Sequence, residues 1–207
     1  MVLKDDLDVF SAREKSLGVF VRDRFKDHLD LVNGLLSDDS FLGLVSDVAS
    51  LMVDVFRSGN KVLICGNGGS AADAQHFATE LTARFELERR ALPAVSLSSD
   101  SSFLTAWSND YSFDSVFSRQ VEALGVKGDL LISFSTSGNS RNVLLAVEKA
   151  RSRGLKTVSF LGRDGGSLKG LSDLDLIVPH ENTARIQEVH ELCYHVICGL
   201  VDKEFRE

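Results

Sequence analysis

The sequence is poor in the residues that stabilise secreted and membrane-embedded chains. Its 207 residues include three cysteines, two prolines and one tryptophan. An odd number of cysteines without zinc-finger spacing argues against a disulfide framework, so we expect Cys65, Cys193 and Cys198 to be reduced thiols. No apolar stretch approaches the roughly 18 residues that a membrane-spanning helix needs. The acidic start of the chain lacks the pattern of a signal peptide, and together these absences predict a cytoplasmic protein.

Clusters of positive charge are also missing. The chain has 23 Lys and Arg residues against 30 Asp and Glu, a formal net charge of −7, and no basic run. A nucleic-acid-binding surface is normally strongly basic, so we expect neither a nucleic acid nor a membrane as partner. The length suits one domain with a core of its own, residues 1–207, and a hydrophobic content of 43% is typical of globular proteins.

The first 58 residues carry apolar side chains at helical intervals, interrupted at 38–40 and ended by the sequence at 58–60. We therefore expect two helices in a segment, 1–58, that precedes an α/β core, 61–207. The first helix is long and rich in apolar positions. It is expected to pack against a partner subunit, although it could instead cover one end of a sheet.

From Lys61 onward, apolar strand-like runs alternate with helical patterns. Strands are predicted at 61–65, 94–97, 129–134, 155–161 and 174–178, and a last helix from Thr183 towards Phe205. Strands separated by helices form a parallel sheet, which makes the fold class α/β. Ligands of such sheets bind beyond the carboxyl ends of the strands. Three polar loops are expected there: 66–70, 98–100 and 135–140.

The first of these loops reads Gly66-Asn67-Gly68-Gly69-Ser70. Glycine tolerates positive φ angles and close backbone approach. Ser70 and Asp73 have the spacing of a capping box, which predicts that a helix begins there and directs N–H groups at an anion. The pattern Gly-x-Gly-x-x-Ala also fits a dinucleotide fingerprint, but the acidic residue expected about 20 positions later is not at the end of the second strand, so this is the poorer interpretation.

His76 and Glu80 are four residues apart in the helix that follows, with Arg84 one turn further on. An imidazole and a carboxylate on one helix face can share a metal ion or act as an acid/base pair. The alternative is a solvated polar stripe, which is common on helices. The position of this stripe, one turn beyond a predicted anion site, favours the functional interpretation.

The loop after the third strand contains four hydroxyl side chains, from Ser135, Thr136, Ser137 and Ser140. Hydroxyls, backbone amides and a helix N-terminus can together hold a phosphate. Serine is also common in ordinary loops and caps, which is the alternative. The lysine of a GxxxxGK[ST] loop is missing, and this argues against an ATPase.

The last helix contains Gln187, His190 and His195. The two histidines are five apart and do not share a face well. Gln187 and His195 are eight apart, about 12 Å along the helix axis. If both serve one centre, one of them is more comfortably supplied by another subunit. A histidine in an amphipathic helix can also be purely structural, and this remains the alternative for His195.

Four motifs, GNGGSAADAQHFATEL, SND, SFSTSGNS and ARIQEVHELCYH, together resemble the sugar isomerase (SIS) domain family and, more narrowly, the bacterial phosphoheptose isomerases. The resemblance extends from about Asn60 to the C-terminus. It implies a three-layer αβα sandwich with a five-stranded parallel sheet, and a homotetramer with active sites between subunits. It also implies conversion of D-sedoheptulose 7-phosphate to D-glycero-D-manno-heptose 7-phosphate, the step that begins heptose synthesis for lipopolysaccharide core or related surface glycans.

The resemblance also assigns roles to residues of this sequence. It implies Glu80 and His195 as the acid/base pair and one zinc ion per subunit held by His76, Glu80, Gln187 and His195. The residues that it implies for binding the sugar phosphate are Asn67, Gly68, Gly69, Glu80, Asn109, Asp110, Ser135, Thr136, Ser137, Ser140 and Gln187. Two departures, Ser108 where many members have glycine and Ala184 where some have aspartate, concern fine specificity.

Two other functions are compatible with parts of the pattern. A relative of this family is a non-enzymatic regulator that binds the replication initiator DnaA and keeps the glycine and serine loops without the acid/base pair. The presence of both Glu80 and His195 favours an enzyme. Sugar-phosphate sensor domains are usually fused to a DNA-binding module, which is missing from this sequence.

Overall fold

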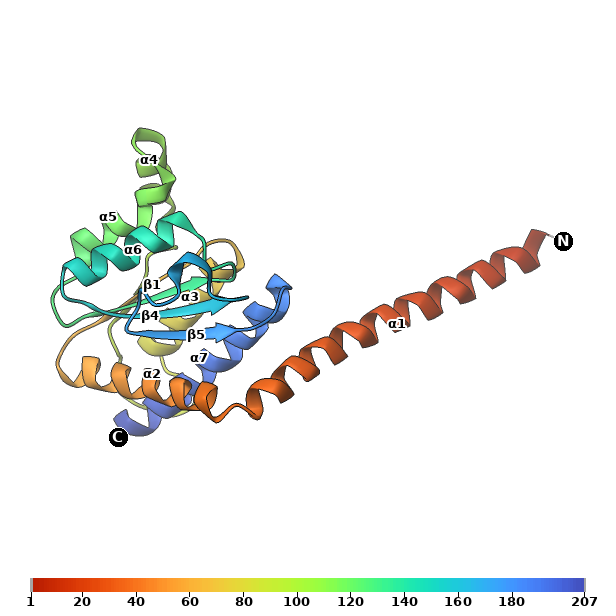
Figure 1. Ribbon diagram of the computed structural model, residues 1–207, viewed down its shortest axis with the longest axis horizontal. Coiled ribbons are helices and arrows are strands. Elements are labelled where there is room, and N and C mark those ends of the chain that lie inside the picture. Colours follow the sequence, from red (N-terminus) through yellow and green to blue (C-terminus); the bar gives the residue numbers. More distant parts are fainter. Residues whose placement is uncertain (1, 207) are drawn as a thin grey trace. The chain divides into compact units, whose positions relative to one another are not determined.

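A computed structural model describes residues 2–206, and their side chains from residue 16 onward. The chain divides into two compact units, one up to residue 39 and one from residue 40 onward. The first unit consists of a single helix, α1 (Val2–Leu36), drawn in red in Figure 1. A turn at residues 37–38 ends it, which confirms the predicted break between two N-terminal helices.

The second unit contains one parallel sheet and the helices that cover it. It begins with α2 (Asp39–Arg57), whose buried face carries Phe41, Val48, Met52 and Phe56. The remaining elements, in chain order, are β1 (Val62–Cys65), α3 (Gly69–Thr82), β2 (Ala94–Ser96), α4 (Ser101–Asp110), η1 (Phe113–Ser115), α5 (Val116–Leu124), β3 (Leu130–Ser135), α6 (Arg141–Ser152), β4 (Lys156–Gly162), η2 (Gly166–Leu168), β5 (Leu174–Val178) and α7 (Thr183–Phe205).

The five strands are all parallel and lie in the order β2-β1-β3-β4-β5. In the register of the sheet, Leu63 pairs with Val95 on one side and with Leu131 on the other. The chain therefore winds from β1 first to one side and then to the other, which makes the β1/β3 boundary the topological switch point. Ligands of doubly wound sheets bind at such a point, beyond the carboxyl ends of the strands.

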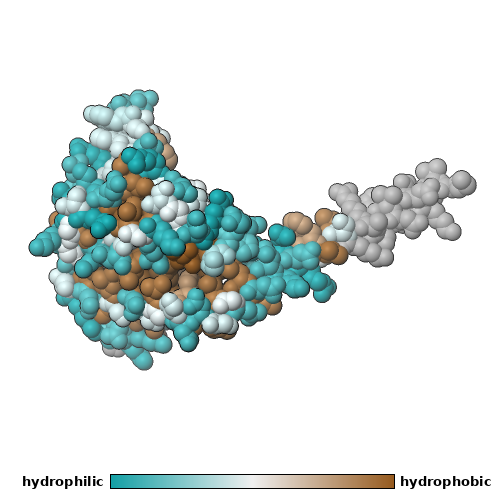
Figure 2. All heavy atoms as spheres, viewed as in Figure 1, coloured by the Kyte–Doolittle hydropathy of each residue, from teal (hydrophilic) through white to brown (hydrophobic). Residues whose placement is uncertain are grey.

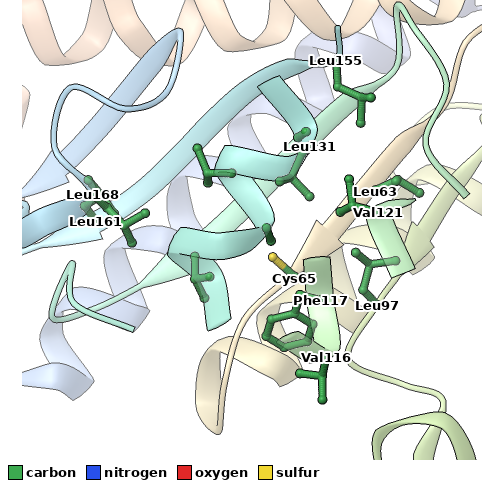
Figure 3. Close-up of a cluster of buried hydrophobic side chains, with 14 residues drawn as sticks. Leu63, Cys65, Leu97, Val116, Phe117, Val121, Leu131, Leu155, Leu161 and Leu168 are labelled. Carbon is green, nitrogen blue, oxygen red and sulfur yellow. The ribbon is translucent and has the colours of Figure 1, made fainter. Parts of the chain in front are cut away.

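Helices cover both faces of the sheet, so the unit is the expected three-layer sandwich. In Figure 1, α5 and α6 lie on one face, and α2, α3 and α7 lie on the other. The α5/α6 side is filled by Leu63, Cys65 and Leu131 from the strands together with apolar residues of the two helices (Figure 3). Because side chains alternate along a strand, Val62 and Ile64 face the opposite layer and are also fully buried.

Aromatic residues fill the layer beneath α3 and α7. Phe134 of β3 stacks on Phe160 of β4 with ring centroids 4.7 Å apart. His190 and Tyr194 of α7 pack against Phe134, and Phe77 of α3 stacks on Tyr194. These contacts fix both helices on the sheet, and the two helices carry the residues of the predicted site.

The start of α3 differs from the predicted capping box. The N-cap is Gly68, with φ 57°, and the helix begins at Gly69 without a side-chain cap. Ser70 lies inside the first turn and is buried, so it is not the capping residue. The sequence pattern was misleading because glycine at a positive φ lets the chain enter the helix two residues earlier. At α4 the cap is a polar side chain: Asp100 accepts a hydrogen bond from the backbone N–H of Phe103.

Candidate active site

Hydrogen bonds join the polar loop at the carboxyl end of β1 to the loop after β2 and to the first turn of α6. The Gly66 N–H donates to the Ser98 hydroxyl at 3.2 Å, and that hydroxyl donates to the Gly66 carbonyl at 2.9 Å. The side-chain amides of Asn67 and Asn142 bond each other reciprocally at 2.8 and 2.9 Å. The loop after β1 is thus tied to the loop after β2 and to the start of α6.

Asn142 is a residue of this site that the sequence analysis did not identify. It is almost fully buried in the first turn of α6, where an amide is unusual unless its polar atoms are paired. Its partner Asn67 was predicted to contact the sugar phosphate. Because its side-chain amide is held by Asn142, Asn67 can contribute most directly through its backbone and through the shape of its loop.

Two glycines of the first loop lie where a side chain would meet a neighbouring residue. A Cβ on Gly66 would lie 2.4 Å from the Ser70 carbonyl oxygen, and one on Gly69 would lie 2.4 Å from Nε2 of Gln187. The Gln187 amide therefore sits against the N-terminus of α3. The first N–H groups of a helix lack an acceptor one turn earlier, so this helix end and the amide together offer N–H donors suited to an anion.

The serine-rich loop is also tightly held. The Ser135 and Ser140 hydroxyls are 3.0 Å apart, and the Asn139 N–H donates to the Ser137 hydroxyl. Gly138 has φ 66°, and a Cβ there would lie 2.0 Å from the Gly165 carbonyl oxygen of the turn after β4. The loop is thus packed against its neighbour, which restricts the positions of its hydroxyls.

Asn109 and Asp110 lie at the C-terminal end of α4, and both are exposed. This helix projects from the rest of the α/β unit in Figure 1. The Asn109 amide donates to the Asp110 carboxylate at 2.9 Å. These two predicted substrate contacts therefore stand at the edge of the unit rather than inside the hydrogen-bonded group of loops.

Helices α3 and α7 lie side by side and run in the same direction. Gly69 faces Gln187 near their N-terminal ends, and His76 contacts Tyr194 and His195 about two turns further along. Because the two helices are parallel, residues at the same height along the pair lie next to each other. It also explains how a site can be built from two segments more than 100 residues apart in the sequence.

The predicted acid/base pair meets within a single chain. His76 Nε2 lies 3.0 Å from Glu80 Oε1 and 3.5 Å from His195 Nε2. The three side chains offer ligand atoms that all lie within 4.8 Å of one another. Glu80 and His195 therefore share one cluster, and their meeting does not require a second subunit.

This cluster has the dimensions of a metal site. Two ligand atoms placed 2.0–2.1 Å from a tetrahedral ion lie about 3.4 Å apart. The two separations around His76 Nε2, 3.0 and 3.5 Å, bracket that value. Imidazole nitrogens with one carboxylate oxygen also form a typical donor set for a divalent transition metal. The residues present therefore fit a metal ion.

Gln187, the fourth ligand that the resemblance implies, lies elsewhere on α7. Its amide is placed against Gly69, and eight residues, about 12 Å of helix, separate it from His195. The structure thus brings His76, Glu80 and His195 together and leaves Gln187 at the N-terminal end of α3, where an anion site is predicted.

Aromatic rings surround His195. Phe85 stacks on its imidazole with centroids 5.3 Å apart, while Tyr194 and His76 approach it edge-on. Phe85, His195 and Lys203 also line a cavity of about 260 Å³. The His195 ring is therefore held in one orientation by its neighbours.

Further acidic groups lie close to His76. Glu191 Oε1 is 3.4 Å from His76 Nδ1, and the Tyr194 hydroxyl is 2.9 Å from the same nitrogen. Burial, followed by the charge of Glu191, raises the pKa of Asp73 to about 6, while the charge of His76 opposes this. Among the described residues, Asp73 Oδ2 is buried without a hydrogen-bond partner. The cluster therefore sits in a region of surplus negative charge.

A buried ion pair fixes the C-terminal end of α3 to α7. Arg89 Nε donates to Asp202 Oδ1 at 2.6 Å, and both side chains are fully buried. The same guanidinium donates to the carbonyls of Glu80 and Leu81, the last turn of α3. Asp202 in turn accepts the N–H groups of residues 86 and 87. This clamp, also missed from the sequence, holds the backbone that carries Glu80.

Known proteins resemble this chain over most of its length. Residues 43–162 match the family model for the SIS domain. A phosphoheptose isomerase of Citrifermentans bemidjiense is 51% identical over 186 residues, which cover 90% of this chain and 96% of that relative. One from Helicobacter pylori is 59% identical over 75% of this chain.

A solved structure agrees with these sequence relatives. The structure of a phosphoheptose isomerase from Neisseria gonorrhoeae superimposes with a TM-score of 0.84 at 43% identity, covering 90% of this chain and 99% of that one. Fold and sequence similarity thus agree, and the chain belongs to the SIS-domain family of phosphoheptose isomerases.

Proposed function

We propose that this protein converts D-sedoheptulose 7-phosphate to D-glycero-D-manno-heptose 7-phosphate, the first step of ADP- or GDP-heptose synthesis for lipopolysaccharide core or surface glycans. The observation that carries the proposal is the meeting of Glu80 and His195 in one cluster, with their ligand atoms within 4.8 Å. Membership of the phosphoheptose isomerase family supports the same reaction.

The substrate phosphate is assigned to the polar loops at the sheet edge. The N-terminus of α3, from Asn67 to Gly69, offers backbone N–H groups, and Gln187 adds an amide beside it. The resemblance adds the hydroxyls of the 135–140 loop and, from the end of α4, Asn109 and Asp110. No lysine is required, because amides, hydroxyls and a helix dipole suffice to hold a phosphate.

The separation of the two ends of the site suits a seven-carbon substrate. Built from bonds of about 1.5 Å, an extended seven-carbon chain with a terminal phosphate spans roughly 10 Å. Gly69 and His76 are seven residues apart on α3, which is also about 10 Å. A phosphate at the start of α3 would therefore leave the reacting carbons, C1 and C2, beside His76 and Glu80.

The reaction requires two proton movements. In the ketose-to-aldose direction, one group removes a proton from C1 and returns it to C2 through an enediol. A second group takes the proton of the C1 hydroxyl and delivers a proton to the C2 oxygen. We propose that the Glu80 carboxylate transfers the carbon-bound proton and that the His195 imidazole transfers the oxygen-bound protons. Stacking of Phe85 on His195 supports this role because it orients the ring.

We assign one zinc ion per subunit to the cluster of His76, Glu80 and His195, with Gln187 as the fourth ligand that the family resemblance implies. When bound, zinc would polarise the sugar carbonyl and stabilise negative charge on oxygen. The spacing of the nitrogen and carboxylate atoms supports this choice. The placement of Gln187 beside Gly69 means that it would have to reach a zinc site by movement or from a neighbouring subunit.

A homotetramer with active sites at subunit interfaces is part of this proposal, with residues 1–58 serving assembly and 61–207 binding the sugar phosphate. Phe20, Phe25 and Leu29 of α1 are each more than half exposed, and large exposed apolar surfaces mark interaction sites. Apolar side chains also show on the α/β unit around α2 and β5 in Figure 2.

The same proposal places the protein in the cytoplasm. Its three cysteines are free and buried, which is typical of chains that fold in a reducing compartment. None of the helices among residues 2–206 combines the length and the apolar character that crossing a bilayer would require.

A non-enzymatic regulator that binds DnaA is not favoured, because both Glu80 and His195 are present and lie together.

The test is turnover of sedoheptulose 7-phosphate in deuterated water, with and without a chelator. An enediol route predicts the aldose product with deuterium at C2, a rate that falls when zinc is removed, and a rate that recovers when zinc is returned. Glu80→Gln should lose turnover. Glu148→Gln, which changes an exposed carboxylate on α6, is the matched control and should keep it.

Two results would contradict the proposal. A zinc-loaded parent protein that forms no heptose 7-phosphate would exclude the reaction. Full turnover by Glu80→Gln would leave the reaction in place and exclude Glu80 as the base.

A further inference from the structure

The imidazole of His76 is contacted at both nitrogens. On one side, Nε2 faces Glu80 at 3.0 Å and His195 at 3.5 Å. On the other side, Nδ1 lies 2.9 Å from the Tyr194 hydroxyl and 3.4 Å from Glu191 Oε1. The ring therefore stands between the predicted metal position and a second polar group on α7 that the family resemblance does not include.

The second group consists of one buried and one half-exposed side chain. Tyr194 is fully buried, its ring stacked on Phe77, so its hydroxyl is held in place and points at His76. This hydroxyl forms a hydrogen bond with His76 Nδ1. Glu191 is 47% exposed and contributes carboxylate oxygens as acceptors beside it.

Metal binding makes a specific demand on this ring. A histidine that binds a metal through Nε2 must carry its proton on Nδ1, and that N–H needs an acceptor. The Tyr194 oxygen and the Glu191 carboxylate both lie where they can accept it. Conversely, without a metal the Tyr194 hydroxyl can donate to Nδ1 while Nε2–H donates to Glu80, so this hydroxyl serves either tautomer.

We propose that Tyr194 and Glu191 are positioning residues that hold His76 with Nε2 towards Glu80 and His195 and accept its Nδ1–H, and that they thereby set the affinity of the site for zinc. This inference rests on the proposed function, because it requires a metal ion at the cluster. Outer partners of this kind typically change metal affinity by about 10- to 100-fold when they are removed.

The hydroxyl of Tyr194 makes the larger predicted contribution. It is nearer to Nδ1 than Glu191 is, and its position is fixed because the tyrosine side chain is fully buried. Phenylalanine at this position keeps the ring that stacks on Phe77 and removes only the oxygen. Tyr194→Phe therefore separates the polar contact from the packing.

The experiment measures zinc affinity rather than activity. Metal-free parent protein, Tyr194→Phe and Glu191→Gln are titrated with zinc in competition with a chromogenic chelator. The dissociation constant should rise about 10- to 100-fold in Tyr194→Phe and by a smaller factor in Glu191→Gln. The matched controls are Tyr111→Phe, the other tyrosine of the chain and 71% exposed, and Glu148→Gln, and both should bind zinc as the parent does.

A spectroscopic measurement tests the orientation itself. In the zinc-loaded parent, histidine ¹⁵N spectra should show His76 with Nε2 bound to the metal and Nδ1 protonated. Metal bound at Nδ1 would overturn the inference.

The outcomes separate this inference from the proposed function. Zinc binding by both variants within twofold of the parent would overturn the inference and leave the metal site intact. A parent protein that takes up no zinc would overturn both. Melting of the metal-free variants is measured alongside, and the half-exposed Glu191→Gln gives a second reading of the same contact if Tyr194→Phe unfolds.

Discussion

The buried pair of Arg89 and Asp202 makes a strong prediction about stability. Asp202→Asn keeps the shape of the side chain and removes its charge, which leaves the Arg89 guanidinium fully buried without a counter-ion. Breaking one partner of a buried pair is destabilising by about 3–5 kcal/mol, because the remaining charge stays out of water. The three carbonyl contacts that Arg89 makes within 3.0 Å, to residues 80, 81 and 90, are neutral and cannot compensate for the lost charge.

The assay is equilibrium unfolding in urea, with thermal melting as a second measure. For a chain of this length, a loss of 3–5 kcal/mol corresponds to a decrease of roughly 6–20 °C in the melting temperature. The matched control is Glu204→Gln, which breaks the pair that Glu204 forms with Arg57. That pair has a similar separation, 2.7 Å, but its side chains are 56% and 51% exposed. Exposed pairs contribute about 0–1 kcal/mol, so the control should melt almost as the parent does.

Two outcomes would refute this reasoning. A decrease of less than about 1 kcal/mol for Asp202→Asn would mean that the Arg89 charge is solvated or paired elsewhere. Equal losses in Asp202→Asn and Glu204→Gln would mean that burial does not decide the strength of these pairs. Arg89 also binds the carbonyl of Glu80, so loss of the ion pair should loosen that end of α3. We therefore expect folded Asp202→Asn to turn over more slowly than the parent.

Three further predictions concern the site and its surroundings. Glu80→Gln chains mixed with His195→Ala chains should recover no turnover, since both residues of a cluster come from one chain; recovery in proven mixed oligomers would contradict this. Asn142→Ala leaves the Asn67 amide unpaired, so urea unfolding should detect a loss of about 1–3 kcal/mol and kinetics should detect a higher KM for the sugar phosphate; an unchanged KM would show that the paired amides do not shape the loop. Burial lowers the pKa of His190 to about 4, so below pH 6.5 the unfolded state takes up a proton that the folded state does not. The free energy of unfolding is therefore unaffected by this histidine above pH 6.5 and decreases as the pH falls from 6.5 towards 4. Between pH 7 and pH 5 the parent should therefore lose more stability than His190→Gln does, and equal losses would contradict the assignment.

Much of the fold could be predicted from local patterns. The strand Leu174–Val178 and the helix Thr183–Phe205 begin and end where the apolar pattern indicates. Their limits follow from periodicity and polar flanks, which are local properties. The first turn of α3 was predicted less well because a positive φ at Gly68 moved the helix start, and a serine–aspartate spacing cannot report a backbone angle.

The contacts that complete the site could not be predicted, because they join distant segments. Asn67 and Asn142 are 75 residues apart, and Arg89 and Asp202 are 113 apart. Periodicity specifies which face of a helix is buried but does not specify which side chain lies opposite. One signal was available in the sequence: Glu191 lies four residues from both Gln187 and His195, so the three share a face of the last helix.

The reciprocal amide bonds between Asn67 and Asn142 have a consequence for how this sequence can change over time. Each amide bonds both the donor and the acceptor of the other, so a substitution at either position alone leaves two partly buried polar atoms without this partner. We expect homologous sequences to keep both asparagines or to exchange both together, and a family in which the two positions vary independently would show that the pairing is dispensable.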